Sequence, residues 1–211
     1  MTTSHIQRAI DRALAHDSLI DADILSIKGF STGIQRRLIS NLCELPGRPV
    51  YMEVGCYAGG TACAAINNKS LEAIFFEDFS QPFGEPDIRG QLMHNVYITP
   101  TKEDTRITVI EEDFFKYDLG KLPKIDIYYY DGEHSRESQK RGILHAFPQL
   151  ADDFILIVDD FDWVDVLNGT TDALDELMDK VELVESWQLT DGVPDGPRFH
   201  NGILIGLFKK S

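Results

Sequence analysis

Short apolar runs alternate with helical stretches from Val50 to the end of the chain. The runs contain few polar side chains, which is typical of strands that are buried on both faces of a parallel sheet. Five such strands are predicted at residues 50–54, 73–76, 107–110, 125–130 and 154–158. Helices are predicted between them, at residues 61–68, 87–97, 135–147 and 163–180. This alternation indicates right-handed βαβ units.

The end of the chain departs from this alternation. Residues 181–189 and 201–209 are predicted as two strands with no helix between them, so they form a hairpin whose last strand runs antiparallel to its neighbour. The fold class is therefore α/β: a doubly wound, Rossmann-like, seven-stranded sheet, mostly parallel, with an antiparallel terminal hairpin strand. The acidic pair Asp152-Asp153 precedes the strand at 154–158 and is interpreted as a solvated turn.

The first 46 residues have helical spacing instead. One predicted helical face carries Ile6, Ile10, Ala13 and Leu14. A second helix is predicted from Gln35 to Leu45, and Pro46-Gly47 ends it. We therefore expect one domain over residues 1–211, with a helical cap at 1–46 and the Rossmann-like core at 47–211.

Charge and cysteine content narrow the class of protein. The net charge of −15 and the lack of a basic stripe argue against nucleic-acid binding. No apolar run approaches the roughly 20 residues of a membrane span, and the charged N-terminus is no secretory signal. Three cysteines without a CxxC spacing are expected to be free thiols in a reducing cytosol. We expect a cytoplasmic protein with a small-molecule partner, and a homo-oligomer remains open.

Acidic side chains gather where the predicted strands end. Ligands of open α/β sheets bind outside the carboxyl ends of the strands. Five successive strands have acids at or just beyond this end: Glu53, Glu77-Asp78, Glu111-Glu112-Asp113, Asp131 with Glu133 and His134, and Asp159-Asp160. Adjacent like charges repel each other, by about 4 kcal/mol at 4 Å for an effective dielectric near 20. Exposure to water, a shared proton or a bound cation would offset that repulsion.

The glycine turn after the first strand, EVGCYAGGT, differs from a dinucleotide fingerprint. Tyr57 stands where that fingerprint has its second glycine, and its bulk disfavours a pyrophosphate. The N-terminus of the following helix would attract a carboxylate instead. Glu77 follows Gly55 by 22 residues, a spacing typical of an acid that accepts ribose hydroxyls. The turn predicts a ligand with a ribose and a carboxylate but no phosphate.

Five motifs in this order resemble those of class I S-adenosylmethionine-dependent methyltransferases. They are YMEVGCYAGGT, an acid after the second strand, VIEEDFF, IDIYYYDGEHS and ILIVDDF. The pair DGEHS and VDDF is similar, more narrowly, to small-molecule O-methyltransferases related to macrolide-sugar and rhamnosyl methyltransferases. The resemblance covers residues 28–210.

The resemblance implies a role for each motif. Glu53 and the turn from Gly55 to Gly59 would line the methionine moiety, and Thr61 would cap the next helix. Glu77 would bind the ribose, Asp113 the adenine amino group, and Phe114 would lie near the ring. The full implied cofactor set is Glu53, Gly55, Cys56, Tyr57, Gly59, Thr61, Glu77, Asp78, Asp113, Phe114 and Asp131. Asp131, Asp159 and Asp160 would hold Mg²⁺ or a similar divalent cation. The implied catalytic residues are Asp131 and His134, the latter as general base or substrate contact.

The expected function is S-adenosylmethionine-dependent, metal-dependent O-methylation of a small hydroxylated acceptor, a sugar or a phenolic compound. A metal-independent small-molecule methyltransferase and a non-catalytic nucleoside-binding domain are the alternatives. Acceptor specificity is expected in the N-terminal helices and in residues 80–87 and 190–200. Four residues have two interpretations, ligand contact or a local structural role: Ser31, Thr32, Trp163 and His200. Tyr128 to Tyr130 are expected to serve strand packing.

Overall fold

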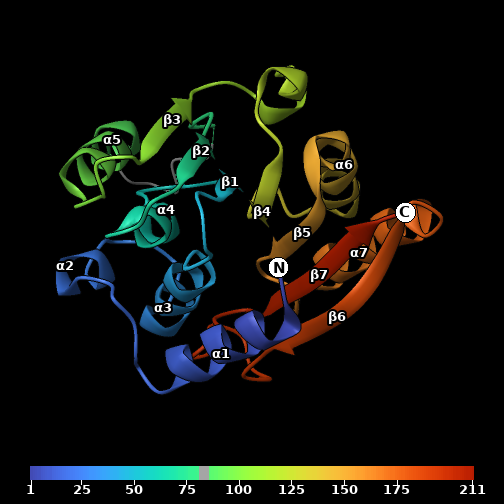
Figure 1. Cartoon of the computed structure of the whole chain (residues 1–211), viewed down its shortest axis with the longest axis horizontal. Coiled ribbons are helices and arrows are strands. Elements are labelled where there is room, and N and C mark those ends of the chain that lie inside the picture. Colours follow the sequence, from blue (N-terminus) through green and yellow to red (C-terminus); the bar gives the residue numbers. More distant parts are fainter. Residues whose placement is uncertain (81–85) are drawn as a thin grey trace.

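The computed structural model describes residues 1–80 and 86–211, which form one seven-stranded sheet with helices on both faces (Figure 1). The strand order is β3-β2-β1-β4-β5-β7-β6. The strands are β1 (Val50–Val54), β2 (Glu72–Phe76), β3 (Arg106–Ile110), β4 (Ile125–Tyr130), β5 (Leu150–Val158), β6 (Val181–Leu189) and β7 (Ile203–Lys210). The first five are parallel to one another, and β7 runs antiparallel to both of its neighbours. The predicted fold class and the terminal hairpin are confirmed.

Seven α-helices and three short 3₁₀ helices are found in the described residues. The α-helices are α1 (Thr3–Leu14), α2 (Ala22–Leu25), α3 (Gly33–Leu42), α4 (Gly60–Ile66), α5 (Ile88–Ile98), α6 (Arg136–Ala146) and α7 (Val164–Leu177). The 3₁₀ helices are η1 (Phe114–Lys116), η2 (Leu119–Lys121) and η3 (Phe147–Gln149). No helix in these residues is long and apolar enough to cross a membrane.

Alternate residues of the central strands face two separate apolar layers. In β4, Ile127 and Tyr129 belong to the layer that α1, α3 and α4 cover. Tyr128 and Tyr130 belong to the opposite layer, which α6 and α7 cover. Figure 1 shows the N-terminal helices, in blue, on the opposite side of the sheet from α6 and α7. Burial on both faces explains why the strands are apolar almost throughout.

The N-terminal helices join the first layer through α3. Thr32 begins α3 with a capping box, in which its side chain accepts from Gln35 N and Gln35 Oε1 accepts from Thr32 N. The capping role considered for Thr32 is thereby confirmed. Ile6 and Ala13 of the predicted helical face are buried, whereas Leu14 of the same face is 40% exposed. It is the last residue of α1, where the helix leaves the core.

Three predicted boundaries need correction. The helix predicted to Leu45 ends at Leu42, and the helix predicted over 163–180 ends at Leu177. The pair Asp152-Asp153 does not form a turn, because β5 already begins at Leu150 and Asp153 is in register with Lys209 of β7. Both aspartates are exposed. The register of β4 and β5 shifts between the pairs Ile125–Leu150 and Ile127–Ile155, so Asp152 and Asp153 have no paired residue in β4 and stay exposed while β5 continues.

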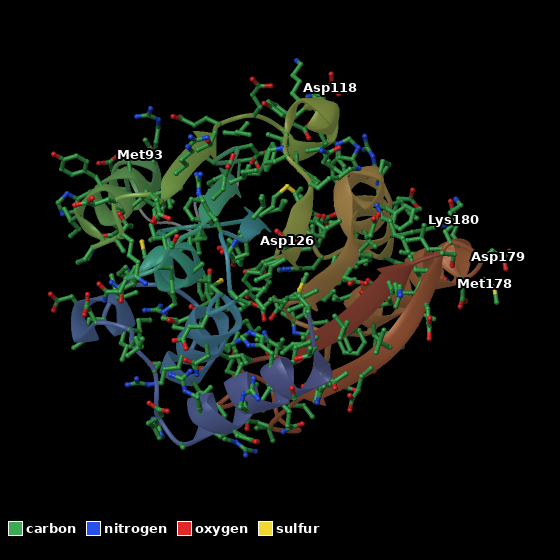
Figure 2. All side chains as sticks on the ribbon, viewed as in Figure 1. Met93, Asp118, Asp126, Met178, Asp179 and Lys180 are labelled. Carbon is green, nitrogen blue, oxygen red and sulfur yellow. The ribbon has the colours of Figure 1, made fainter. Side chains whose placement is uncertain are left out.

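Two exposed methionines lie on opposite sides of the molecule: Met93 on α5 and Met178 after α7 (Figure 2). Asp126, near the centre of the same view, accepts a hydrogen bond from Val50 N at 2.8 Å. This bond ties the beginning of β4 to the beginning of β1, so the two strands also end side by side.

Candidate active site

A cavity of about 750 Å³ opens at the carboxyl ends of β1, β2, β4 and β5. The strand order reverses between β1 and β4, and ligands of doubly wound sheets bind at such a reversal. Most of the predicted site residues line this cavity: Gly55, Cys56, Tyr57, Thr61, Glu77, Asp78, Asp113, Phe114, Asp131, His134, Asp159 and Asp160. Glu53 and Gly59 do not line it.

The glycine turn is held between the two strands that flank β1. Gly55 N donates to Phe76 O at 3.0 Å, and Asp131 N donates to Val54 O at 2.9 Å. Gly55 has φ +85°, and a Cβ atom built there would lie 1.9 Å from the carbonyl oxygen of Asp131. Only glycine allows this approach, so the turn and the acid after β4 are positioned together.

Glu53 connects β1 to the start of α4. It is fully buried, and its two carboxylate oxygens accept from Thr61 Oγ1 at 2.6 Å and Tyr51 OH at 2.5 Å. The geometry therefore gives Glu53 no contact with a ligand in the cavity. Thr61 does not cap α4 as predicted, because Gly59 is the cap residue and the Thr61 hydroxyl is bound to Glu53.

The buried Glu53 carboxyl should make stability depend on pH. Burial raises the pKa of Glu53 from its usual 4.5 to about 7. Between these values the folded state holds the proton more tightly than the unfolded state, so folding stability falls as pH rises from about 4.5 to about 7. Glu53→Gln should remove this contribution, which is on the order of 3 kcal/mol at about 1.4 kcal/mol per pKa unit. Urea unfolding of both proteins at pH 5 and pH 8 would measure it, and parallel pH profiles would contradict it.

Glu77 lies at the cavity wall beside the glycine turn. Its carboxylate accepts from Tyr57 N at 2.7 Å and from Phe79 N at 3.0 Å. Burial raises the pKa of Glu77, while these backbone hydrogen bonds act in the opposite direction. Each oxygen keeps a lone pair for a further donor. The carboxylate is therefore fixed in place with capacity to accept hydroxyl groups.

Asp113 and Phe114 form the far end of the cavity. Asp113 accepts from Phe115 N at 2.9 Å and lies 3.0 Å from Lys116 Nζ, and the Lys116 ammonium lowers the pKa of Asp113. Phe114 is buried and packs edge-on against Phe76 with ring centroids 5.1 Å apart. This end thus offers an apolar ring beside a carboxylate.

Asp131, His134 and Asp160 converge at the opposite end. His134 Nε2 lies 3.4 Å from Asp131 Oδ1 and 3.2 Å from Asp160 Oδ2. One ligand atom from each of the three lies within 4.8 Å of the others, so a metal ion could join them. Burial raises the pKa of Asp131 well above its usual range, and the charges of Asp159 and Asp160 add to this. None of the described residues that line the cavity is Lys or Arg. A divalent cation fits this set of donors.

Asp159, also predicted as a metal ligand, lines the cavity but is not one of the three residues whose ligand atoms converge. Tyr129 OH donates to its Oδ2 at 2.5 Å, and Gln35 Nε2 and Asp160 N donate to its Oδ1 at 3.3 and 3.1 Å. Burial raises the pKa of Asp159 to about 7, with the charge of Asp160 as the next cause. Three hydrogen-bond donors hold the Asp159 carboxylate in place. The converging set consists of Asp131, His134 and Asp160. Tyr129 therefore does more than pack in the sheet.

Several residues with two interpretations are now placed. Trp163 is not a core residue, because it is 46% exposed and lines the cavity. Its ring packs against the His134 ring in a T-shaped arrangement, with the ring centroids 5.0 Å apart. His200 lines the cavity from a turn in which it pairs with Gly196. Ser31 lines it too, and accepts from Arg36 Nε at 2.9 Å. Of the loop expected to govern specificity, residues 81–85 lie outside the described residues.

Sequence reasoning missed some of the cavity wall. Phe30, Asp195 and Asn201 line the cavity, and no motif marks them. Asp195 belongs to the segment 190–200 that was expected to govern acceptor specificity, whereas Phe30 and Asn201 lie just outside the segments named for that role. Gln35, which binds Asp159 from α3, has no sequence signal because its partner is distant along the chain.

Comparison with known proteins identifies the family to which the chain belongs. Residues 52–161, just over half of the chain, match the family described as a methyltransferase domain. The chain belongs to this family. The match contains the glycine turn and the converging Asp131, His134 and Asp160. No curated protein matches the chain.

Solved structures share the fold of this methyltransferase at low sequence identity. An O-methyltransferase from Bacillus cereus in complex with SAH has 11% identity and a TM-score of 0.60, covering 99% of this chain and 92% of that one. A precorrin-6y C5,15-methyltransferase from Geobacter metallireducens has 18% identity and a TM-score of 0.59, covering 92% and 98%. A SAH-bound Podospora anserina methyltransferase has 13% identity and a TM-score of 0.56, covering 100% and 89%. These similarities establish the fold of the methyltransferase and nothing finer.

Proposed function

We propose that the protein transfers a methyl group from S-adenosylmethionine to a hydroxyl group of a small acceptor, a sugar or a phenolic compound, with the help of a divalent cation. The observation that carries the proposal is the convergence of Asp131, His134 and Asp160 in the same cavity as the glycine turn. The narrower resemblance to macrolide-sugar and rhamnosyl methyltransferases supports a hydroxylated acceptor. The SAH in two structures of the same fold supports the choice of cofactor.

The cofactor would lie along the first half of the cavity. Glu77 would accept the ribose hydroxyls, and Phe114 and Asp113 would contact the adenine. The backbone around Gly55 and Tyr57 would bind the methionine end. The sulfonium would then face Asp131, whose position is tied to Gly55 by their backbone contact.

Methyl transfer from a sulfonium is an in-line displacement, so alignment supplies much of the rate, about 7–11 kcal/mol in favourable cases. When bound, a cation would lower the pKa of a ligated hydroxyl and orient it. Asp131 and Asp160 would hold that cation. His134 Nε2 would accept the proton that leaves the acceptor hydroxyl. Trp163 would form the wall on which the acceptor ring rests, next to the imidazole.

Asp160→Asn tests the cation, because it removes a charged ligand with almost no change in shape. Loss of an indirect partner of a metal ligand typically costs 10–100-fold, so loss of a ligand should cut turnover by more than about 100-fold. Affinity for SAH, measured by calorimetry, should stay the same. Asp153→Asn is the matched control, since Asp153 is an exposed acid at the other end of β5.

Three results would count against the proposal. Absence of heat with S-adenosylmethionine and SAH at millimolar concentration would contradict the cofactor. Full activity of Asp160→Asn, together with full activity in chelator, would contradict the cation and favour a metal-independent methyltransferase. Failure to methylate any sugar or phenol in a panel of acceptors, despite cofactor binding, would contradict the acceptor class.

A further inference from the structure

Asn201 contacts Asp160 from a distant part of the chain. It lies two residues before β7 and is 5% exposed. Its Nδ2 donates to Asp160 Oδ1 at 2.8 Å, and its Oδ1 accepts from Asp195 N at 3.1 Å. Its backbone carbonyl accepts from Asp162 N at 2.8 Å. Both ends of the side-chain amide are therefore used, one by the acid and one by the loop between β6 and β7.

The two oxygens of Asp160 have different surroundings. Oδ1 is bound to Asn201, whereas Oδ2 lies 3.2 Å from His134 Nε2, inside the converging set. Asp160 has φ +51°, a left-handed conformation that costs energy for any residue other than glycine. The surroundings must hold it there. The hydrogen bond from Asn201 engages one oxygen of the Asp160 carboxylate and leaves the other directed toward His134.

We propose that Asn201 is a positioning residue, which orients Asp160 so that Oδ2 alone is presented to the cation. The inference rests on the proposed function, because it requires that a cation binds at Asp131 and Asp160. A hydrogen bond to one oxygen of a carboxylate ligand fixes the orientation of the carboxylate. Asn201 therefore acts on the cation through Asp160 and touches no reacting atom.

The same side chain connects the cation site to the wall that faces the acceptor. Asp195 and His200, which line the cavity, precede Asn201 in the β6–β7 loop. Asp191 organises this loop, accepting from Arg198 N at 2.7 Å and from Phe199 N at 3.0 Å. Asn201 thus binds the loop with its oxygen and Asp160 with its nitrogen. Backbone hydrogen bonds from Phe161 N and Asp162 N to Gly202 O and Asn201 O already join the loop to the segment after β5, and the Asn201 side chain adds the one link that reaches the Asp160 carboxylate.

Asn201→Ala tests the inference, with Mn²⁺ as the probe in place of an unidentified native cation. We expect the dissociation constant for Mn²⁺, measured by electron paramagnetic resonance, to rise about 10–100-fold. The dissociation constant for SAH, measured by calorimetry, should not change. Asn41→Ala is the matched control: Asn41 is equally buried, and its Nδ2 donates to Ala9 O and Asp17 O, which lie in and just after α1. It should lower the melting temperature and leave Mn²⁺ affinity unchanged.

The outcomes separate this inference from the proposed function. A native protein that does not bind Mn²⁺ contradicts the proposed cation and removes the basis of the inference. Native binding with unchanged affinity in Asn201→Ala overturns the inference alone. Equal weakening in Asn41→Ala also overturns it, because general destabilisation would then be the cause. If Asn201→Ala does not fold, Asn201→Ser, whose hydroxyl is too short to reach Asp160, takes its place with the same expected change.

Discussion

Replacement of His134 by asparagine is expected to slow methyl transfer by about two to four orders of magnitude, the usual contribution of a general base. Asparagine keeps a polar group near Asp131 and Asp160 but cannot take a proton from the acceptor. Affinity for SAH should be unchanged, because none of the contacts proposed for the cofactor comes from His134. Single-turnover rates with saturating S-adenosylmethionine would measure the loss.

His200→Asn is the matched control for this substitution. His200 is the other imidazole that lines the cavity, but its Nε2 lies near the exposed Asp195, at 3.5 Å, and not near the converging acids. Its loss should affect acceptor binding more than the rate of the chemical step. Mn²⁺ affinity distinguishes the roles of His134: a base leaves it nearly intact, and a metal ligand does not. An unchanged single-turnover rate in His134→Asn would show that the proton goes elsewhere.

The substitution Gly55→Ala should have the largest effect on both folding and cofactor binding. Its new Cβ would lie 1.9 Å from the carbonyl oxygen and 2.7 Å from the carbonyl carbon of Asp131, which are backbone atoms that cannot rotate away. The turn after β1 would have to move away from β4. Left-handed backbone costs about 1–2 kcal/mol for alanine, and overpacking typically adds about 1–3 kcal/mol. SAH binding should be lost even in protein that remains folded.

Gly47→Ala separates strain from overlap. Gly47 has φ +86°, nearly the same as Gly55, but a Cβ there would meet nothing within 4 Å. It should therefore show only the cost of the left-handed backbone and bind SAH normally. Urea unfolding and calorimetry on the two variants give the comparison. Equal destabilisation with equal SAH binding would mean that the turn relaxes freely and is not tied to Asp131.

Much of the fold could be predicted because burial leaves a local trace in sequence. The strands of the sheet centre are apolar on both faces, and the helices between them make parallel pairing the natural arrangement. The predictions were less accurate where a strand is interrupted, as β5 is by the shift in its register with β4. The start of β5 carries Asp152 and Asp153, which are exposed and charged although they belong to the strand. Polarity at the end of a buried strand resembles a turn, so the boundary was placed too late.

Similar acids at the strand ends turned out to have different roles. Glu53 and Glu77 both lie at the carboxyl end of a predicted strand, yet Glu53 is fully buried and Glu77 lines the cavity. Asp159 and Asp160 are neighbours in the sequence, yet Asp159 accepts a hydrogen bond from Tyr129, whereas Asp160 faces His134. Side-chain direction changes with one backbone dihedral, such as the positive φ of Asp160, and residue type does not reveal it.

The order of residues was sufficient to place a glycine turn and a row of acids at one edge of a parallel sheet, because strand ends and their periodicity are local properties. It was not sufficient to say which carboxylate oxygens meet. Asn201, Gln35 and Tyr129 set that arrangement from three separate segments of the chain. Their hydrogen bonds depend on distances of a few tenths of an ångström between elements far apart in sequence, and only the packing of all the layers determines such distances.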